Sequence, residues 1–151
     1  ETLSILPPYL RNETEDNPAA IDYRDWHVPL GRRFRALKLW FVLRSYGAEN
    51  LRTFIRSHVA WAKELESKVL NDSRLELAAP RTLALVCFRH TDGNDATRKL
   101  ADAINASGSA YVTPSVTDDV AYIRVSIGST WTERRHVEDL WNLIDSNAGL
   151  K

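Results

Sequence analysis

The chain has 151 residues, which is enough for one ordinary domain with its own core or for a large piece of a bigger protein. Lysine plus arginine and aspartate plus glutamate both number 20, so no net charge favours nucleic acid or an acidic membrane surface. There is no apolar run of membrane-spanning length, no methionine and only one cysteine, Cys87, which together favour a soluble, cytoplasmic C-terminal fragment without an internal disulfide.

The first part of the chain lacks the pattern of any regular element. Residues 1–28 are polar and interrupted by prolines, so we expect a mobile loop there. A helix is expected after Leu30, and between Phe34 and Leu43 it is apolar in nearly every direction. Because such a helix is buried on all sides, we expect a missing domain or a second subunit to cover it.

The middle of the chain predicts one long amphipathic helix and two strands. Apolar positions recur every three or four residues after Gly47, at Leu51, Phe54, Ile55, His58, Ala62, Leu65 and Val69. Residues 74–77 and 82–89 have strand composition and flank Pro80. The second strand is apolar on both faces, which predicts a central position in the sheet.

The last third predicts a helix, a hairpin and a closing helix. Residues 94–107 are helical in pattern, with Ala96, Leu100, Ala103 and Ile104 inward and Gly108 as a left-handed cap. Strands at 110–116 and 120–127 meet at Thr117, Asp118 and Asp119, and Pro114 favours an edge strand. A capping box from Thr130 to Glu133 predicts the start of a helix that buries Val137, Leu140, Trp141 and Ile144. This order predicts an α+β fold, with a small, mostly antiparallel sheet and helices on one face.

The residues alone do not assemble a self-contained active site. His27, His58, His90 and His136 lack a pairing pattern, and zinc-ligand spacing is absent, so no metal site is predicted. Cys87 lies in a buried strand pattern, where a thiol stays protonated. The basic residues from Arg32 to Arg44 are compatible with a phosphate-binding patch, although a solvated helix end explains them as well and is favoured.

One long stretch carries a specific resemblance. Its ordered residues are Asp22, Tyr23, Arg24, Trp26, Pro29, Leu30, Gly31, Arg32, Arg33, Phe34 and Arg35, and further matches lie at residues 8–10, 46–47, 85–89 and 123–124. This series resembles the segment that follows the active-site lysine in group II pyridoxal-phosphate-dependent decarboxylases of aromatic amino acids. The resemblance implies a fold-type-I enzyme, a homodimer, and a chain that corresponds to the C-terminal part of it.

That resemblance also implies how the chain is organised. Residues 1–28 would be a catalytic-loop segment of the missing large domain, residues 29–72 connecting and amphipathic helices, and residues 73–151 the C-terminal α+β domain. In the family the lysine that binds pyridoxal 5′-phosphate follows a histidine, and this chain has no His-Lys pair. The cofactor-binding residues are therefore expected upstream, and the fragment alone is expected to be inactive.

Four residues are expected to serve the active site because they match the family's motif. Tyr9 corresponds to the loop tyrosine that donates a proton after carbon dioxide is lost, and a phenol with a pKa near 10 is protonated at neutral pH. Gly31 and Leu30 would line the substrate pocket, where glycine rather than serine leaves room for a large aromatic ring. Arg24 would support the active site at the subunit junction.

Several alternatives remain open at this point. A related aldehyde synthase, a decarboxylase of non-aromatic acids and a non-catalytic dimerisation module could all use this scaffold. Tyr9 speaks against the synthase, because those relatives typically carry phenylalanine at this loop position. A nucleic-acid binder is the weakest alternative, given the balanced charge.

Overall fold

The computed structural model describes residues 33–149, and the chain divides into two compact units, Glu1–Ser45 and Tyr46–Lys151. The first unit contributes α1, Ala36–Tyr46, at the position where a helix is predicted. Gly47 ends it with a φ of 75°, a conformation that glycine adopts without steric cost. The predicted loop at residues 1–28 lies outside the described residues.

Helix α1 presents apolar side chains in all directions. None of its residues is buried. The exposed large apolar residues are Leu37, Leu39, Trp40, Phe41, Val42, Leu43 and Tyr46. A helix of this composition is stable in water only when other surfaces cover it, so its burial in a larger protein stays a prediction.

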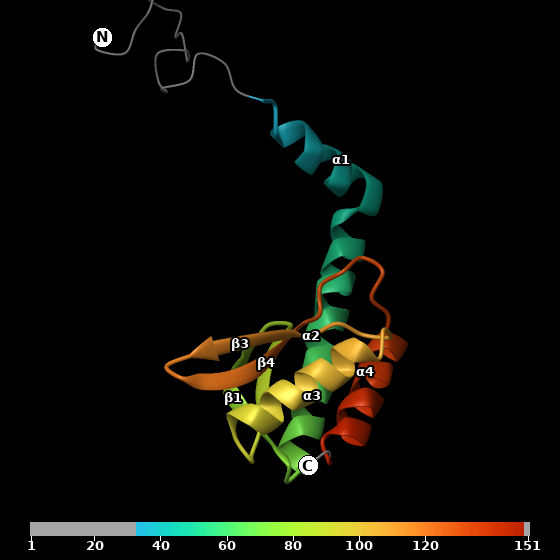
Figure 1. Ribbon diagram of the computed structural model, residues 1–151. Coiled ribbons are helices and arrows are strands. Elements are labelled where there is room, and N and C mark those ends of the chain that lie inside the picture. The colour runs from blue at the N-terminus through green and yellow to red at the C-terminus, as the bar shows by residue number, and fades with distance from the viewer. Residues whose placement is uncertain (1–32, 150–151) are drawn as a thin grey trace, which may run out of the picture. The chain divides into compact units, whose positions relative to one another are not determined.

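The second unit has the predicted α+β architecture, with a small antiparallel sheet and helices (Figure 1). Its elements are α2 (Ala48–Asn71), β1 (Leu75–Thr82), β2 (Leu85–His90), α3 (Asn94–Ala106), β3 (Thr113–Thr117), β4 (Val120–Ser126) and α4 (Arg134–Asn147). The strands form one antiparallel sheet in the order β1-β2-β4-β3. The central position predicted for β2 and the edge position predicted for the strand with Pro114 are therefore confirmed.

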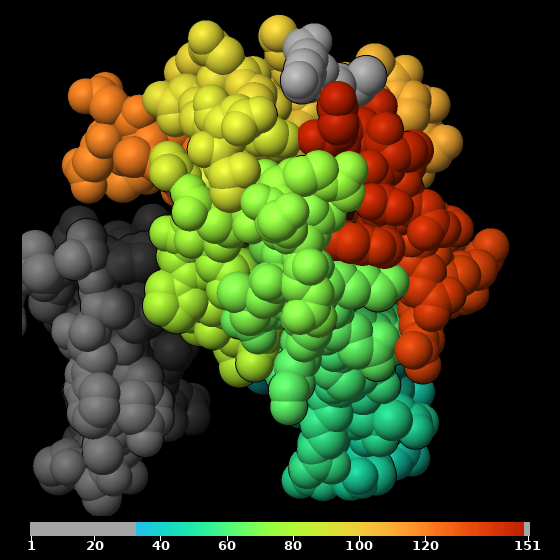
Figure 2. All heavy atoms as spheres, turned by 90° about the horizontal axis from the view of Figure 1, so that it is seen from below, coloured from blue at the N-terminus to red at the C-terminus, as the bar shows by residue number. Residues whose placement is uncertain are grey.

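The core lies between one face of this sheet and the helices. Along β4, Ala121, Ile123 and Val125 are buried, while Arg124 and Ser126 between and after them are exposed. Helices α2 and α4 pack side by side, as the view from below shows (Figure 2), and Arg134 on α4 pairs with Glu64 on α2. The largest fully buried side chains are Phe88, Leu65, Leu100, Ile104, Ile123, Ile144, Val69, Val86 and Thr97.

Both turn predictions are confirmed. Gly108, after α3, has a φ of 70°. Asp118 and Asp119 form the two-residue loop between the paired Thr117 and Val120, with φ values of 48° and 61°. A type I′ hairpin turn needs such positive φ values at both central residues, and aspartate tolerates them better than most residues.

The inward face of α3 differs from the prediction. Ala96 and Ala103 are only half-buried, whereas Thr97 and Ala101 are buried with Leu100 and Ile104. The Thr97 hydroxyl donates to the Gly93 carbonyl oxygen at 2.8 Å and accepts from the His90 backbone N–H at 3.0 Å. These two bonds satisfy the hydroxyl inside the core, so the helix can turn its threonine inward.

The last helix begins later than predicted, and two residues predicted to face the core, Trp141 on α4 and Ile55 on α2, are not fully buried. The N-cap of α4 is Glu133, which forms a capping box with His136, while a turn from Ser129 to Thr132 precedes it. The Trp141 side chain packs against the core but is only half-buried, and the Lys68 ammonium lies 5.6 Å from its ring centroid. Ile55 is 58% exposed, because α2 extends beyond the sheet there.

An arginine ties the end of α2 to the end of α4. The Arg74 guanidinium donates to the Asp72 carboxylate at 2.6 Å and also to the Asp145 carboxylate. The Arg74 hydrogen bonds hold the pKa of Asp72 below its usual value, although partial burial opposes this shift. Because the folded-state pKa is lowered, the ion pair stabilises the fold above the unfolded pKa and is lost as pH falls through the folded one.

We therefore expect Asp72→Asn to lower the free energy of unfolding by about 1 kcal/mol at pH 7, with the difference shrinking below about pH 4. Urea unfolding at pH 7 and pH 3 measures both values. Asp95→Asn is the matched control, because the Asp95 side chain is 93% exposed at its pair with Arg98. An Asp72→Asn difference that is equally large at both pH values would contradict the role of the carboxylate charge.

Candidate functional site

The residues predicted to serve the active site all precede the described part of the chain. Tyr9, Arg24, Leu30 and Gly31 lie outside residues 33–149. Their roles stay predictions. Of the other matched residues, 85–89 lie on β2 and 123–124 on β4, two neighbouring strands of the sheet.

The matched strand β2 alternates between core and open face. Val86 and Phe88 are fully buried, and Cys87 and Arg89 point to the opposite side. Arg89 forms an ion pair with Glu76 of the neighbouring strand β1. The charge of Arg89 is thus compensated by Glu76 on the open face of the sheet, which favours a structural role for this arginine.

Cys87 does not have the surroundings of a nucleophile. Burial raises the pKa of its thiol, and the Arg124 guanidinium on the neighbouring strand β4 only partly offsets this effect. A thiol held in its protonated form is a poor nucleophile. This agrees with the prediction that Cys87 is not a nucleophile.

A cavity in this unit lies between β4, the segment before β3 and the start of α4. Its volume is about 540 Å³, and its lining includes Tyr111, Arg124, Trp131, His136 and Asp139. Tyr111 and Trp131 are 81% and 85% exposed, so they form an open rim. The His136 ring accepts the backbone N–H of Glu133 through Nδ1 at 3.1 Å, which engages it in the helix cap. The cavity has no lysine in its lining.

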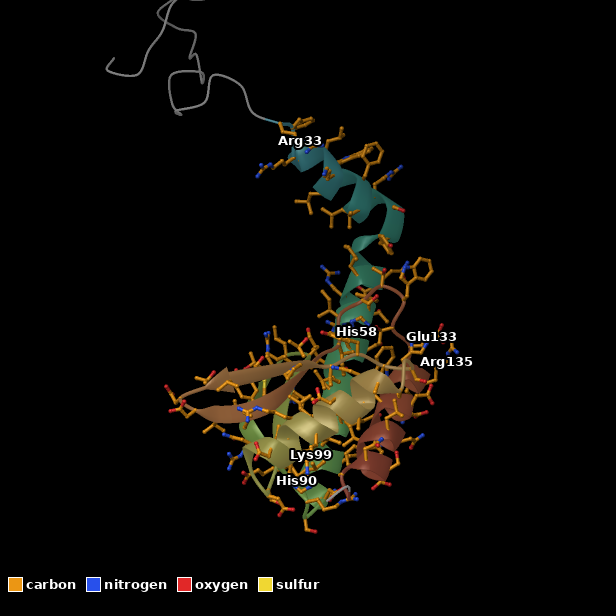
Figure 3. The ribbon with its side chains drawn as sticks, viewed as in Figure 1. Arg33, His58, His90, Lys99, Glu133 and Arg135 are labelled. Carbon is orange, nitrogen blue, oxygen red and sulfur yellow. The ribbon has the colours of Figure 1, made fainter. Side chains whose placement is uncertain are left out.

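The lysines among residues 33–149 do not fit a pyridoxal-phosphate site. Lys38, Lys63 and Lys99 are exposed, and Lys99 lies on the surface of α3 (Figure 3). Lys68 is half-buried, with its ammonium against the Trp141 ring. A Schiff-base lysine needs an enclosed environment that favours the neutral amine. Among residues 33–149, no lysine therefore has the surroundings expected of a Schiff-base lysine, and no group of three or more metal-ligating side chains occurs among them either.

Two buried histidines lie far apart in the second unit, His58 on α2 and His90 at the end of β2 (Figure 3). His90 accepts the Asp92 backbone N–H through Nδ1 at 3.0 Å, and its Nε2 lies 2.9 Å from the Ala148 carbonyl oxygen. This pattern assigns the proton to Nε2 and leaves both nitrogens satisfied. His90 is therefore a structural residue that holds the end of α4.

His58 is different, because its Nε2 atom is buried without a hydrogen-bond partner among the described residues. The side chain is 3% exposed and lies between two aromatic rings, with centroid distances of 4.1 Å to Phe54 and 5.2 Å to Trp61. An unsatisfied buried nitrogen costs free energy. The sequence placed His58 on the inner face of α2, but no signal in it reveals the missing partner.

We expect His58→Leu to raise the free energy of unfolding of the chain by about 1 to 2 kcal/mol, because the substitution removes an unpaired polar atom and keeps the volume. His90→Leu is the matched control and should be destabilising, since it breaks two hydrogen bonds. Urea unfolding of the three proteins provides the comparison. Equal destabilisation by both substitutions would show that the His58 ring is satisfied in solution.

None of the helices within residues 33–149 combines the length and the apolar character needed to cross a bilayer.

Comparisons with known proteins place the chain in a family. The pyridoxal-dependent decarboxylase conserved domain matches residues 1–91. Phenylacetaldehyde synthase from a Rosa hybrid cultivar is 44% identical over 161 residues, covering 97% of the chain and 32% of the relative. Tyrosine/DOPA decarboxylase 1 from Papaver somniferum is 43% identical, with the same coverage of 97% and 32%.

A solved structure agrees with the sequence match. The crystal structure of Oryza sativa TDC with PLP and tryptamine has a TM-score of 0.84 and 39% identity, covering 97% of this chain and 32% of that one. The chain thus spans about a third of the length of the relatives it matches. With the family profile matching more than half of its residues, the chain belongs to the pyridoxal-dependent decarboxylase family.

Proposed function

We propose that the full-length protein containing this chain is a pyridoxal-phosphate-dependent decarboxylase that converts aromatic L-amino acids to arylalkylamines and carbon dioxide. Relatives named tyrosine/DOPA decarboxylase and tryptophan decarboxylase support this, at 43% and 39% identity. The active form would be a homodimer in the cytoplasm. Residues 1–28 would form the catalytic loop that closes over the active site. Residues 29–72 would form connecting and amphipathic helices, and residues 73–151 would form the C-terminal small domain.

The presence of tyrosine rather than phenylalanine at position 9 favours a decarboxylase over an aldehyde synthase. Overall similarity does not separate the two reactions, because a phenylacetaldehyde synthase and a tyrosine/DOPA decarboxylase match almost equally well. An amine product requires a proton at the alpha carbon after carbon dioxide has left. The Tyr9 hydroxyl can supply that proton at neutral pH, whereas a phenylalanine cannot.

The other matched residues would shape the site around this step. When bound, the cofactor supplies the electron sink that stabilises the carbanion left by decarboxylation. Leu30 and Gly31 would form the pocket wall beside the aromatic ring, and Arg24 would position the loop at the subunit junction. Closing the loop would exclude water and oxygen from the carbanion and bring the Tyr9 hydroxyl to the alpha carbon.

Release of labelled carbon dioxide tests this proposal. The full-length protein, supplied with pyridoxal 5′-phosphate, should release label from carboxyl-labelled tyrosine, DOPA or tryptophan and much less from glutamate. The chain of 151 residues alone should release none. Release from glutamate and not from any aromatic acid would contradict the proposed substrate class. Release by the isolated chain would contradict the expectation that the cofactor-binding residues lie outside it.

The pocket role of Gly31 predicts a change of specificity. Gly31→Ser in the full-length enzyme should lower kcat/KM for indole and catechol amino acids more than for substrates with smaller rings, by about 1 to 3 kcal/mol, because a side chain would intrude beside the ring. Steady-state kinetics with tryptophan, DOPA and tyrosine measure the difference. Equal losses on all three substrates would assign Gly31 a backbone role instead.

A further inference from the structure

The turn between β2 and α3 contains an Asp-Gly pair, Asp92-Gly93, and the sequence has no second Asp-Gly and no Asn-Gly pair. Aspartate followed by glycine is chemically labile, because glycine has no Cβ to keep its amide nitrogen away from the aspartate side-chain carboxyl. When the two groups meet, the chain closes to a succinimide ring. Hydrolysis of that ring leaves mostly isoaspartate, in which the main chain runs through the former side-chain carboxyl.

Both groups that would react are accessible in the structure. The Asp92 side chain is 77% exposed. Apart from the chain neighbours of Gly93, no heavy atom lies within 4 Å of the position that a Cβ on this glycine would occupy. A ring can therefore form at this pair without displacing packed side chains.

Hydrogen bonds to His90 nevertheless hold both backbone amides of the pair. The Gly93 N–H, whose nitrogen is the nucleophile, donates to the His90 carbonyl oxygen at 3.2 Å and closes a β-turn over residues 90–93. The Asp92 N–H donates to Nδ1 of the His90 ring at 3.0 Å. The Gly93 nitrogen must lose its proton to attack, so ring closure breaks at least the first of these bonds.

His90 can restrain the pair because it is itself fixed from two sides. The residue is 6% exposed, and its Nε2 atom lies 2.9 Å from the carbonyl oxygen of Ala148, the C-cap of α4. Its backbone N–H donates to the Thr97 hydroxyl on α3 at 3.0 Å. Opening of the turn therefore requires these contacts with α3 and α4 to loosen, which makes such opening rare in the folded protein.

We propose that Asp92-Gly93 is a latent isoaspartate site and that His90 keeps it unreacted in the folded protein. In the reaction the Gly93 nitrogen bonds to Asp92 Cγ, and the hydroxyl of the protonated carboxyl leaves as water together with the nitrogen's proton. One water then cleaves the bond between the Asp92 main-chain carbonyl carbon and the Gly93 nitrogen. The product has the same composition as the original chain. The proposal does not depend on which reaction the enzyme catalyses.

The modification would disturb the start of α3. Isoaspartate makes the main chain one methylene longer immediately before Gly93. The Gly93 carbonyl oxygen accepts the Thr97 N–H at 3.1 Å and the Thr97 hydroxyl at 2.8 Å, so a displaced Gly93 loses both bonds. Modified molecules should therefore unfold at a lower urea concentration than unmodified ones.

Peptide mapping of the full-length enzyme measures the modification. The enzyme is kept in neutral buffer for several weeks and digested with trypsin, which releases residues 90–98 between Arg89 and Arg98. Isoaspartate is recognised by the changed retention of this peptide and by its fragmentation after electron transfer. A synthetic peptide of residues 90–98 gives the rate without the fold. The enzyme should modify Asp92 at least about tenfold more slowly than the peptide, because the turn must open first.

His90→Leu tests the restraint, because leucine offers no acceptor for the Asp92 N–H and no donor for the Ala148 carbonyl oxygen. Modification of Asp92 in this variant of the full-length enzyme should be at least about fivefold faster than in the wild type, since the turn opens more often. Asp92→Glu should abolish the signal at this position, because glutamate would have to close a larger and less favoured ring.

Val125→Ala is the matched control for His90→Leu. Val125 is buried on β4 and pairs with Val86, so it lies toward the other end of β2 from His90. Its truncation removes core contacts without touching the turn. It should change the rate of modification by less than about twofold, even where it lowers the urea midpoint as much as His90→Leu does.

Three outcomes would overturn the proposal. One is that the wild-type enzyme modifies Asp92 as fast as the synthetic peptide, because the fold then gives no restraint. Another is that His90→Leu forms isoaspartate no faster than the wild type. The last is that Val125→Ala accelerates the modification as much as His90→Leu, because global unfolding and not opening of the turn would then control it. All three can be observed whether or not the enzyme decarboxylates aromatic amino acids.

Discussion

Tyr9→Phe in the full-length enzyme should lower the rate of amine formation by about 100- to 10,000-fold, because the substitution removes the proton donor and keeps the loop's shape. Carbon dioxide should still be lost. The carbanion that is left without a proton can react with oxygen, which yields aldehyde, ammonia and hydrogen peroxide with water as the co-reactant. Amine, aldehyde and peroxide are measured together in one reaction mixture.

Tyr111→Phe is the matched control for this substitution. Tyr111 is also a loop tyrosine, 81% exposed, and lies beside the cavity near β4. Its loss of a hydroxyl should leave the amine rate unchanged. If Tyr9→Phe produces amine at the wild-type rate without peroxide, Tyr9 is not the proton donor, and its match to the family's loop tyrosine carries no catalytic role.

Phe88→Ala should lower the free energy of unfolding of the chain by about 3 to 5 kcal/mol, the usual range for removing a large aromatic side chain from a core. Phe88 is fully buried at the centre of β2, which lies between β1 and β4. A cavity at that position removes contacts with both helices and strands. Urea unfolding measures the loss, and it should be large enough to unfold much of the protein at 37 °C.

The control for Phe88→Ala is Phe41→Ala, on α1. Phe41 is 57% exposed, so its removal from the isolated chain should cost less than about 1 kcal/mol. In the full-length enzyme the same substitution should cost more if other surfaces cover α1, as its composition predicts. A small loss for Phe88→Ala in the isolated chain would mean that the second unit lacks a cooperative core.

Much of the fold follows from local pattern. The two-faced apolar composition of β2 predicts its central position, and the spacing of α2 predicts its inner face from His58 to Val69. Such patterns are reliable because side chains of strands and helices repeat with fixed periods. The sequence pattern predicts burial less well where a polar residue forms a hydrogen bond inside the core, as Thr97 does. It also fails where a helix extends beyond the sheet it packs on, as α2 does at Ile55.

The candidate site could not be predicted in the same way. No spacing of histidines, cysteine or carboxylates in the chain predicts a catalytic set, because the chemistry of this family resides in its pyridoxal cofactor. Only the resemblance of residues 8–10 and 22–44 to the family points to Tyr9, Arg24, Leu30 and Gly31. The unpaired nitrogen of His58 and the positive φ of Leu83 appear only in the structure, because composition encodes neither a missing partner nor a φ angle.

The ratio of amine to carbon dioxide tests the proposed reaction most directly. The full-length enzyme, given tyrosine, DOPA or tryptophan in the presence of oxygen, should form one arylalkylamine for each carbon dioxide released and no hydrogen peroxide above background. This result is expected if Tyr9 protonates the alpha carbon. Formation of aldehyde and peroxide in step with carbon dioxide would instead make the protein an aldehyde synthase and contradict the role of Tyr9.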